Sequence, residues 1–213
     1  MTDQAERVLK DEADSGVGPW SGIYEHLAGA YDFVMASSGW HRMMDRYALE
    51  GLEPGSLLDV GCGTGRVMKQ AVERGFEVYG IDPAPKMVEE ASKSTGLGAD
   101  RVRIASAAAL PFDDGRFDVV LESGALLHVA DITAAASEMI RVTKPGGVIR
   151  IYDYAAPEST GPYTRVVEIW SRTMDYQVHD FRSAFEPATK CEAHVSIGRG
   201  GYLQRFDFRK PRG

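Results

Sequence analysis

The middle of the chain alternates short apolar runs with amphipathic segments. Five apolar runs suit buried strands, at residues 56–60, 76–81, 101–105, 117–121 and 148–153. Three segments with helical spacing of apolar residues lie among them, at 66–74, 86–94 and 132–142. Strands that alternate with helices of about ten residues are typical of βαβ units. The pattern therefore predicts an α/β fold with a parallel sheet.

The N-terminal part lacks this alternation. Residues 1–18 are polar and end with Gly16 and Gly18 close together, which predicts a flexible arm. Within residues 19–50, apolar side chains recur at three- and four-residue spacing, which predicts N-terminal helices. We expect the arm to precede a single domain that covers residues 19–213.

The alternation is also lost beyond Tyr154. A helix is predicted near residues 163–176. Two runs at 194–197 and 202–208, joined by a glycine-rich turn, predict an antiparallel hairpin that closes the sheet. We expect residues 154–192 to form an insert on the substrate side of the domain.

Composition excludes several classes of protein. The 213 residues are 44% hydrophobic and 26% charged, which is ordinary for a globular protein and excludes intrinsic disorder. Cys62 and Cys191 are the only cysteines, so the chain is not a disulfide scaffold. No apolar run approaches the roughly 18 residues of a membrane helix, and the polar N-terminus is not a secretory signal. We therefore expect a soluble, cytoplasmic protein without stable membrane insertion.

The charge balance bears on partners. Lys and Arg number 24 against 31 Asp and Glu, a net charge of −7, which argues against broad nucleic-acid binding. No cysteine or histidine cluster has metal-ligand spacing, so no metal site is predicted. No heptad pattern stands out, and the oligomeric state stays open.

A glycine-rich turn follows the first apolar run. Gly61, Gly63 and Gly65 alternate there, ahead of a helical segment. Glycines permit a tight turn and close approach of a ligand, and free N–H groups at a helix start receive polar groups. Asp82 stands 21 positions after Gly61, where a carboxylate commonly binds the hydroxyls of a ribose. The combination predicts an adenosine-cofactor site; the alternative is a tight βα turn without a ligand.

The glycine spacing separates two kinds of cofactor. Dinucleotide sites have glycines at the first, third and sixth positions of the turn, so that a pyrophosphate can approach. Here the glycines fall at the first, third and fifth positions, and Arg66 occupies the sixth. A bulky side chain at that position disfavours a dinucleotide.

Four motifs in order resemble those of the class I S-adenosylmethionine-dependent methyltransferases, within the group that has a ubiquinone/menaquinone-methyltransferase-like core, the type 11 group. They are Asp59–Gly65, Gly80–Asp82, Ala109–Phe112 with Phe117–Val120, and Arg141–Gly147. The resemblance covers roughly residues 31–153. It implies a doubly wound, Rossmann-like sheet of seven strands, the last antiparallel, with helices on both faces.

The resemblance also implies roles for individual residues toward S-adenosyl-L-methionine. Gly61, Cys62 and Gly63 would pass their backbone along the methionyl part, and Asp59 would fix the loop and the amino group. Asp82 would bind the ribose hydroxyls. The remaining cofactor contacts implied are Met87 and Leu110 on the adenine faces, Ala107 at the adenine edge, Glu122 and Ser123 at the methionyl end, and Tyr31 as a tyrosine that closes over the cofactor.

One position departs from the family pattern. The family often has an acidic residue ahead of the adenine position, and here that residue is Ser106. A serine still accepts a hydrogen bond, but the contact is neutral and weaker than one to a carboxylate. Adenine recognition is therefore expected to rely on backbone contacts and packing.

His128 is the candidate base for a methyl acceptor that must lose a proton. It follows the fourth strand, and the unperturbed pKa of histidine suits proton transfer near neutrality. The alternative is that His128 only packs at the rim of the site. Further candidates are His26, His41, His179 and His194.

Aromatic residues concentrate in two segments outside the core. Residues 20–47 and 152–185 hold 13 of the chain's 20 Trp, Tyr and Phe residues. Pockets for small organic ligands are largely apolar, so these aromatics suit an acceptor site. The alternative is that they pack helices onto the sheet.

The sequence thus predicts methyl transfer from S-adenosyl-L-methionine to a small or lipid-like acceptor by in-line displacement, with S-adenosyl-L-homocysteine as product. A quinone carbon, a phospholipid amine and a natural-product hydroxyl all stay open as acceptors. Two alternatives are a protein that binds the cofactor without turnover and, less favoured, an NAD(P)-dependent oxidoreductase.

Overall fold

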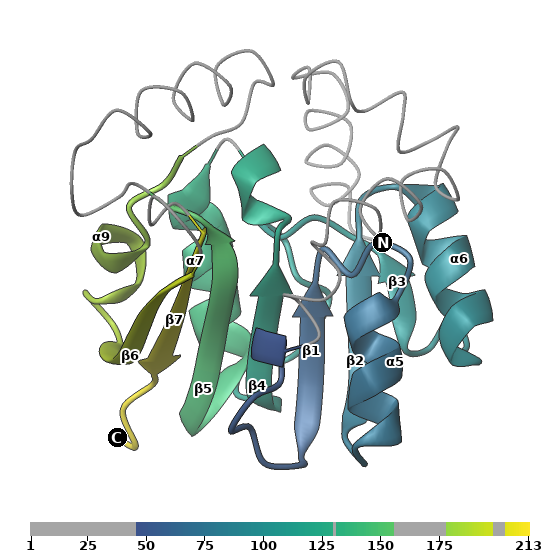
Figure 1. Ribbon diagram of the computed structural model, residues 1–213, viewed down its shortest axis with the longest axis horizontal. Coiled ribbons are helices and arrows are strands. Elements are labelled where there is room, and N and C mark those ends of the chain that lie inside the picture. Colours follow the sequence, from purple (N-terminus) through teal and green to yellow (C-terminus); the bar gives the residue numbers. More distant parts are fainter. Residues whose placement is uncertain (1–45, 130, 156–177, 198–202) are drawn as a thin grey trace.

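The computed structural model describes residues 46–129, 131–155, 178–197 and 203–213 (Figure 1). Within them the chain forms a seven-stranded sheet in the order β3-β2-β1-β4-β5-β7-β6. The strands are β1 (Ser56–Val60), β2 (Glu77–Asp82), β3 (Val102–Ile104), β4 (Phe117–Ser123), β5 (Thr143–Tyr154), β6 (Lys190–Ile197) and β7 (Leu203–Arg209). The helices are α5 (Arg66–Glu73), α6 (Pro85–Thr95), the short 3-10 turn η1 (Leu126–His128), α7 (Ile132–Val142) and α9 (Phe181–Phe185).

Strand directions follow the doubly wound plan. β1 pairs in parallel with β2 and β4, β2 with β3, and β4 with β5. The last strand, β7, runs antiparallel between β5 and β6. The order reverses between β1 and β4, which is where open α/β sheets bind ligands. The predicted fold class, with its antiparallel last strand, is confirmed.

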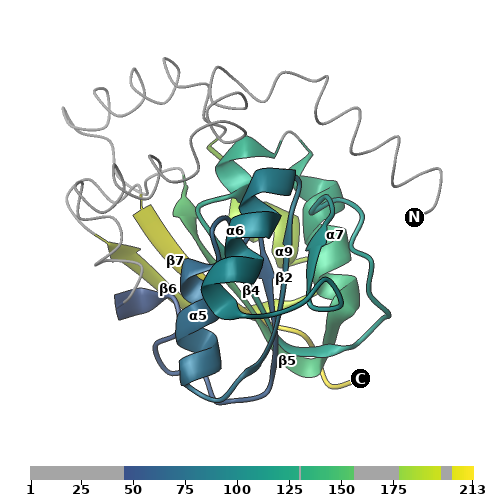
Figure 2. The same cartoon turned by 90° about the vertical axis from the view of Figure 1, so that its right-hand side faces the viewer.

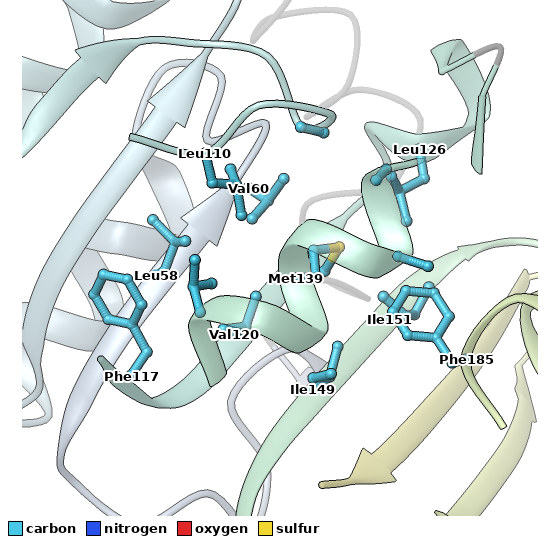
Figure 3. Packing of buried hydrophobic residues seen from close by; sticks show 14 of the residues in the cluster. Leu58, Val60, Leu110, Phe117, Val120, Leu126, Met139, Ile149, Ile151 and Phe185 are labelled. Carbon is cyan, nitrogen blue, oxygen red and sulfur yellow. The ribbon is translucent and has the colours of Figure 1, made fainter. Parts of the chain in front are cut away.

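Two hydrophobic cores cover the two faces of the sheet. Side chains alternate along a strand, so neighbouring residues face opposite layers. Leu57 faces the core formed with α5 and α6, whereas Leu58 faces the core formed with α7 and α9. Figure 2 shows α5 and α7 on opposite sides of the sheet, and Figure 3 shows the second core around Met139.

Predicted and observed element bounds agree best where the apolar pattern is strong. The strand at 56–60 and the helix at 132–142 have the predicted bounds. The fifth strand is longer than predicted, because it begins at Thr143, which pairs with Phe117 ahead of a register shift. The closing hairpin is confirmed, with β6 starting at Lys190.

Several predicted segments lie outside the described residues. They are the arm at 1–18, most of the N-terminal helices at 19–50 and the helix near 163–176. Of the predicted insert at 154–192, the described part contains α9, whose Phe181 and Phe185 are buried in the core beside α7. The domain limits at 19–213 stay a prediction.

A buried arginine ties the segment before β1 to the sheet. Arg150 on β5 is 2% exposed and makes a two-point ion pair with Asp207 on β7. Its remaining N–H groups donate to the carbonyls of Ala48 and Glu50, at 3.1 and 2.7 Å. The end of the N-terminal region is thereby fixed against β5.

Candidate active site

Four acidic residues, three of them predicted site residues, lie at one edge of the sheet. Parallel strands place their carboxyl ends together, so the residues that end β1, β2, β4 and β5 become neighbours. Asp59 and Asp82 stand near the ends of β1 and β2, and Glu122 and Asp153 near the ends of β4 and β5. Figure 1 shows this edge at the top of the sheet.

The loop after β1 is held to β2 through its backbone. The N–H groups of Gly61 and Cys62 both donate to the carbonyl of Ile81, at 2.8 and 2.9 Å. Gly61 and Gly63 have φ of 72° and 53°, in the left-handed region that side chains disfavour. A Cβ on Gly63 would meet no atom within 4 Å, so at this position backbone conformation rather than crowding favours glycine.

Gly61 also allows a close contact with the segment after β4. A Cβ built on Gly61 would lie 2.2 Å from the Cβ of Ala125, far inside van der Waals contact. The glycine loop therefore packs directly against the turn that precedes His128. Two segments 64 positions apart in the sequence meet here.

Asp82 is fixed by backbone donors. Its two oxygens accept the N–H groups of Gly63 and Ala84, both at 2.9 Å. Burial nevertheless raises the pKa of Asp82 to about 6, against the effect of those two hydrogen bonds. Each carboxylate oxygen has two lone pairs, so Asp82 keeps acceptor capacity for ligand hydroxyls.

Asp59 is more deeply buried, at 1% exposure. Its Oδ1 accepts no hydrogen bond from any residue in the described part of the chain. Burial, and then the nearby charge of Asp82, raise the pKa of Asp59 to about 7. A buried acceptor of this kind favours a cationic or N–H donor from a ligand, because buried polar groups normally have partners.

The segment after β3 brings the predicted adenine contacts next to Asp82. The N–H of Ala105 donates to the carbonyl of Asp82 at 3.2 Å. Ser106 is buried, and its Oγ accepts the N–H of Ala108 at 3.0 Å. Ala107 and Leu110 are buried in the core that contains α7, and Met87 is buried in α6.

α7 fixes the position of Leu110. Glu138 Oε2 accepts the N–H of Leu110 at 2.7 Å, and Arg141 donates to its carbonyl at 3.0 Å. The same arginine pairs with Glu138 and donates to the carbonyl of Phe112. The backbone of Leu110 is therefore held at both its N–H and its carbonyl.

The ends of β4 and β5 hold the backbone of the turn at 124–128. Glu122 is fully buried, and its Oε1 accepts the N–H groups of Ala125 and Leu126, at 2.5 and 3.0 Å. Asp153 is fully buried as well, and its Oδ2 accepts the N–H of Leu127 at 2.8 Å. Three consecutive amides of the turn are thus bound by carboxyl groups.

His128 ends this turn and is partly buried. Burial lowers the pKa of His128 to about 4. The imidazole is therefore neutral at neutral pH, which is the form that accepts a proton. It is also a weaker base than the unperturbed value suggested. His179 lies on the other side of the turn, where its Nε2 is 3.0 Å from the carbonyl of Leu126.

Sequence comparison identifies the domain that carries this site. Residues 58–151 match the model of a family described as "Methyltransferase domain". The match runs from β1 through β5 and includes both the glycine loop and the turn at 124–128. Residues 58–151 thus form a methyltransferase domain. The cofactor of this domain class is S-adenosylmethionine, as the sequence predicts.

Two curated relatives of this domain are named for a hydroquinone and for demethylmenaquinone. A 2-methyl-6-phytyl-1,4-hydroquinone methyltransferase of Synechocystis is 37% identical over 62% of this chain and 43% of its own length. A demethylmenaquinone methyltransferase of Beutenbergia cavernae is 34% identical over 64% of this chain and 58% of its own. The aligned part of the chain thus spans about half the length of these relatives.

A solved structure supports the fold. A methyltransferase from Thermotoga maritima matches with a TM-score of 0.69 at 21% identity, over 90% of this chain and 99% of the other. Within the described residues, no helix is long and apolar enough to span a membrane, and no three His, Cys, Asp or Glu residues are placed to hold a metal ion.

The residues of the methyltransferase domain fit its cofactor. The buried, unpartnered Oδ1 of Asp59 suits the amino group of the methionyl part, and the positive-φ glycine loop follows it directly. Asp82, fixed by Gly63 and Ala84, suits ribose hydroxyls. Tyr31 lies outside the described residues, as do His26 and His41.

Asp153 was not among the predicted site residues, and His179 was predicted only as a further candidate base. The sequence signal for Asp153 was an acidic residue at the end of the fifth apolar run. Among the aromatics considered for the acceptor pocket, Tyr152, Phe181 and Phe185 are buried in the two cores and so pack the fold.

Proposed function

We propose that this protein transfers a methyl group from S-adenosylmethionine to a small, lipid-like acceptor by in-line displacement. The observation that carries the proposal is the pairing of a positive-φ glycine loop with two buried carboxylates, Asp59 and Asp82, at neighbouring strand ends. S-adenosylmethionine supplies a methyl group already activated on a sulfonium. The task left to the chain is to bind, to align the acceptor and to exclude water.

Each residue has one task in this proposal. The loop at Gly61–Gly63 and Asp59 bind the methionyl part, and Asp82 binds the ribose. Met87, Ser106, Ala107 and Leu110 enclose the adenine, and Ser123 lies toward the methionyl end. Tyr31 closes over the cofactor. We assign Glu122 a different task below.

A hydroquinone with a hydrophobic tail is the acceptor that we infer. Two relatives carry a hydroquinone or a menaquinone in their names, and they align with 62% and 64% of this chain. A ring carbon beside a hydroxyl becomes nucleophilic when the hydroxyl gives up its proton, so the acceptor needs a proton acceptor nearby. We propose that His128 accepts this proton. We also propose that the protein acts in the cytoplasm.

Calorimetric titration with S-adenosylmethionine, S-adenosylhomocysteine and NADH tests the cofactor. We expect micromolar binding of the two sulfur compounds and no binding of NADH. Binding of NADH alone would overturn the proposal in favour of an oxidoreductase. An acceptor panel follows, containing a prenylated hydroquinone, a phospholipid amine and a phenol. Cofactor binding without S-adenosylhomocysteine formation on any acceptor would instead mark a binding protein without turnover.

His128→Ala should slow methyl transfer by about 10- to 100-fold, less than a strong general base contributes, because burial already makes this imidazole a weak base. The affinity for S-adenosylmethionine should stay the same. Single-turnover rates and calorimetry separate the two quantities. His194→Ala is the control, because His194 lies on β6 with its ring stacked on Phe206 and its Nε2 2.7 Å from Oε1 of Gln204. A wild-type rate in His128→Ala would remove this residue as the proton acceptor.

A further inference from the structure

Two buried carboxyl groups face each other across neighbouring strands. Glu122 on β4 pairs in register with Ile151 on β5, two residues before Asp153. Both side chains are 0% exposed, and both bind amides of one turn: Glu122 accepts the N–H groups of Ala125 and Leu126, and Asp153 accepts that of Leu127. Two charges held so close away from water are unfavourable, so one proton is shared between them.

The surrounding donors show which carboxyl holds the proton. Both oxygens of Asp153 accept backbone N–H groups, Oδ2 from Leu127 and Oδ1 from Tyr154 at 2.6 Å. Glu122 receives two amides on Oε1, whereas Oε2 has no donor from the described residues. A proton on Oε2 of Glu122, donated to Asp153, satisfies both groups. In agreement, burial and the charge of Asp153 raise the pKa of Glu122 well above its ordinary value.

We propose that Glu122 and Asp153 form a pair with one shared proton that positions the turn at 124–128, so that Glu122 is a positioning residue rather than a cofactor contact. The inference rests on the proposed function for its catalytic consequence. The hydrogen bonds themselves do not depend on that function.

The position of the turn matters because the turn packs against the cofactor loop and carries His128. Ala125 packs against Gly61 of the cofactor loop, and His128 ends the same turn. His179 contacts the carbonyl of Leu126 from the opposite side. A shift of the turn would therefore move the proton acceptor relative to the cofactor loop. Displacements of this kind cost rate more than binding.

Asp153→Asn and Glu122→Gln form the test, with Asp113→Asn on the exposed surface as control. Gln retains an oxygen for the two amides and places an N–H where the acid proton was. Asn places an N–H against a backbone N–H, whichever way its amide turns. Hydrogen exchange at Ala125, Leu126 and Leu127, cofactor Kd and kcat are measured for each.

We expect Asp153→Asn to speed exchange at the three amides by at least tenfold and to lower kcat by at least tenfold, with cofactor Kd changed less than threefold. Glu122→Gln should keep the protection within about threefold and stay at least tenfold faster than Asp153→Asn in kcat. Equal effects of the two substitutions, or protection unchanged in Asp153→Asn, would overturn the proposal. So would a Glu122→Gln variant that loses cofactor affinity while the amides stay protected.

If the Asp153→Asn protein does not fold, a second comparison tests the proposal. Glu122→Ala removes the acceptor for Ala125 and Leu126, whereas Glu122→Gln keeps it. Faster exchange only in the alanine variant supports the pair, and equal exchange in both contradicts it. If no acceptor is ever methylated, the proposed function fails, yet the exchange measurements still decide the positioning role.

Discussion

Two pairs of buried carboxyl groups stand at the same edge of the sheet and differ in what binds them. Asp59 and Asp82 end β1 and β2, and Glu122 and Asp153 end β4 and β5. All four are less than 10% exposed. Burial raises the pKa of each.

The two pairs differ in what fills the acceptor positions that backbone amides leave open. Oδ1 of Asp59 has no donor in the described part of the protein, and Asp82 accepts one amide on each oxygen. Asp153 likewise accepts one amide per oxygen, but the proton of the neighbouring Glu122 carboxyl takes a further acceptor position. The two pairs thus have the same residue type and the same position in the fold. They differ in the hydrogen-bond donors around them, which make one pair a ligand site and the other a positioning pair.

Gly61→Ala tests the contact between the loop after β1 and the turn at 124–128, and it should have the largest effect of the substitutions. The new Cβ would collide with Ala125, and the positive φ adds backbone strain. Together these should cost about 2–5 kcal/mol of stability, from overpacking and from left-handed backbone. We also expect cofactor binding to be lost. Urea unfolding and calorimetry measure both.

Ala125→Gly provides the matched control in the Gly61→Ala background. It removes the atom that the new methyl group strikes, so the double variant should regain the overpacking part and keep the backbone strain. A double variant no better than Gly61→Ala would show that the two segments do not contact each other as described.

Asp82→Ala should weaken S-adenosylmethionine binding by about 1–3 kcal/mol, the cost of leaving hydrogen-bonding groups unpaired. Part of the loss comes through the loop, because Asp82 also accepts the N–H of Gly63. Calorimetry against Asp113→Ala, an exposed aspartate, measures the change. Unchanged affinity would refute the ribose assignment and would remove the functional contrast between the two pairs.

Local sequence patterns predicted the region around Asp59 and Asp82 well. The apolar run at 56–60, the alternate glycines and Asp82 are close in sequence, and their tasks follow from backbone rules for turns and strand ends. The helix at 132–142 has the predicted bounds because its apolar spacing is regular, and in the structure Asp131 caps its start.

The region around Glu122 and Asp153 depends on strand pairing, which local sequence patterns do not reveal. Asp153 meets Glu122 only because β5 pairs with β4 in one register. The extension of β5 back to Thr143 crosses Pro145 and two glycines, which locally favour a turn. α9 spans five residues, too few for a helical period to stand out. Tertiary contacts decided all three.

Asp59→Asn should have the smallest effect, and its sign is informative. The pKa of Asp59 rises from an ordinary 3.8 to about 7 in the folded protein. Between those values the folded state binds more protons than the unfolded state, so stability falls as pH rises through this window. Asparagine does not titrate, so the variant should gain on the wild type from pH 4 to 7 and level off above. We expect the variant to be more stable than the wild type at pH 8, with a higher Tm, and to differ little from it at pH 4.

The same substitution should weaken cofactor binding, because a neutral amide replaces a carboxylate opposite the amino group. Greater stability with poorer binding is the expected signature of a buried charge kept for a ligand. Thermal unfolding at pH 4, 6 and 8, with and without S-adenosylhomocysteine, measures both quantities. If Asp59→Asn lowers Tm at pH 8 without ligand, the Asp59 carboxylate stabilises the fold by itself. The first pair would then be as structural as Glu122 and Asp153.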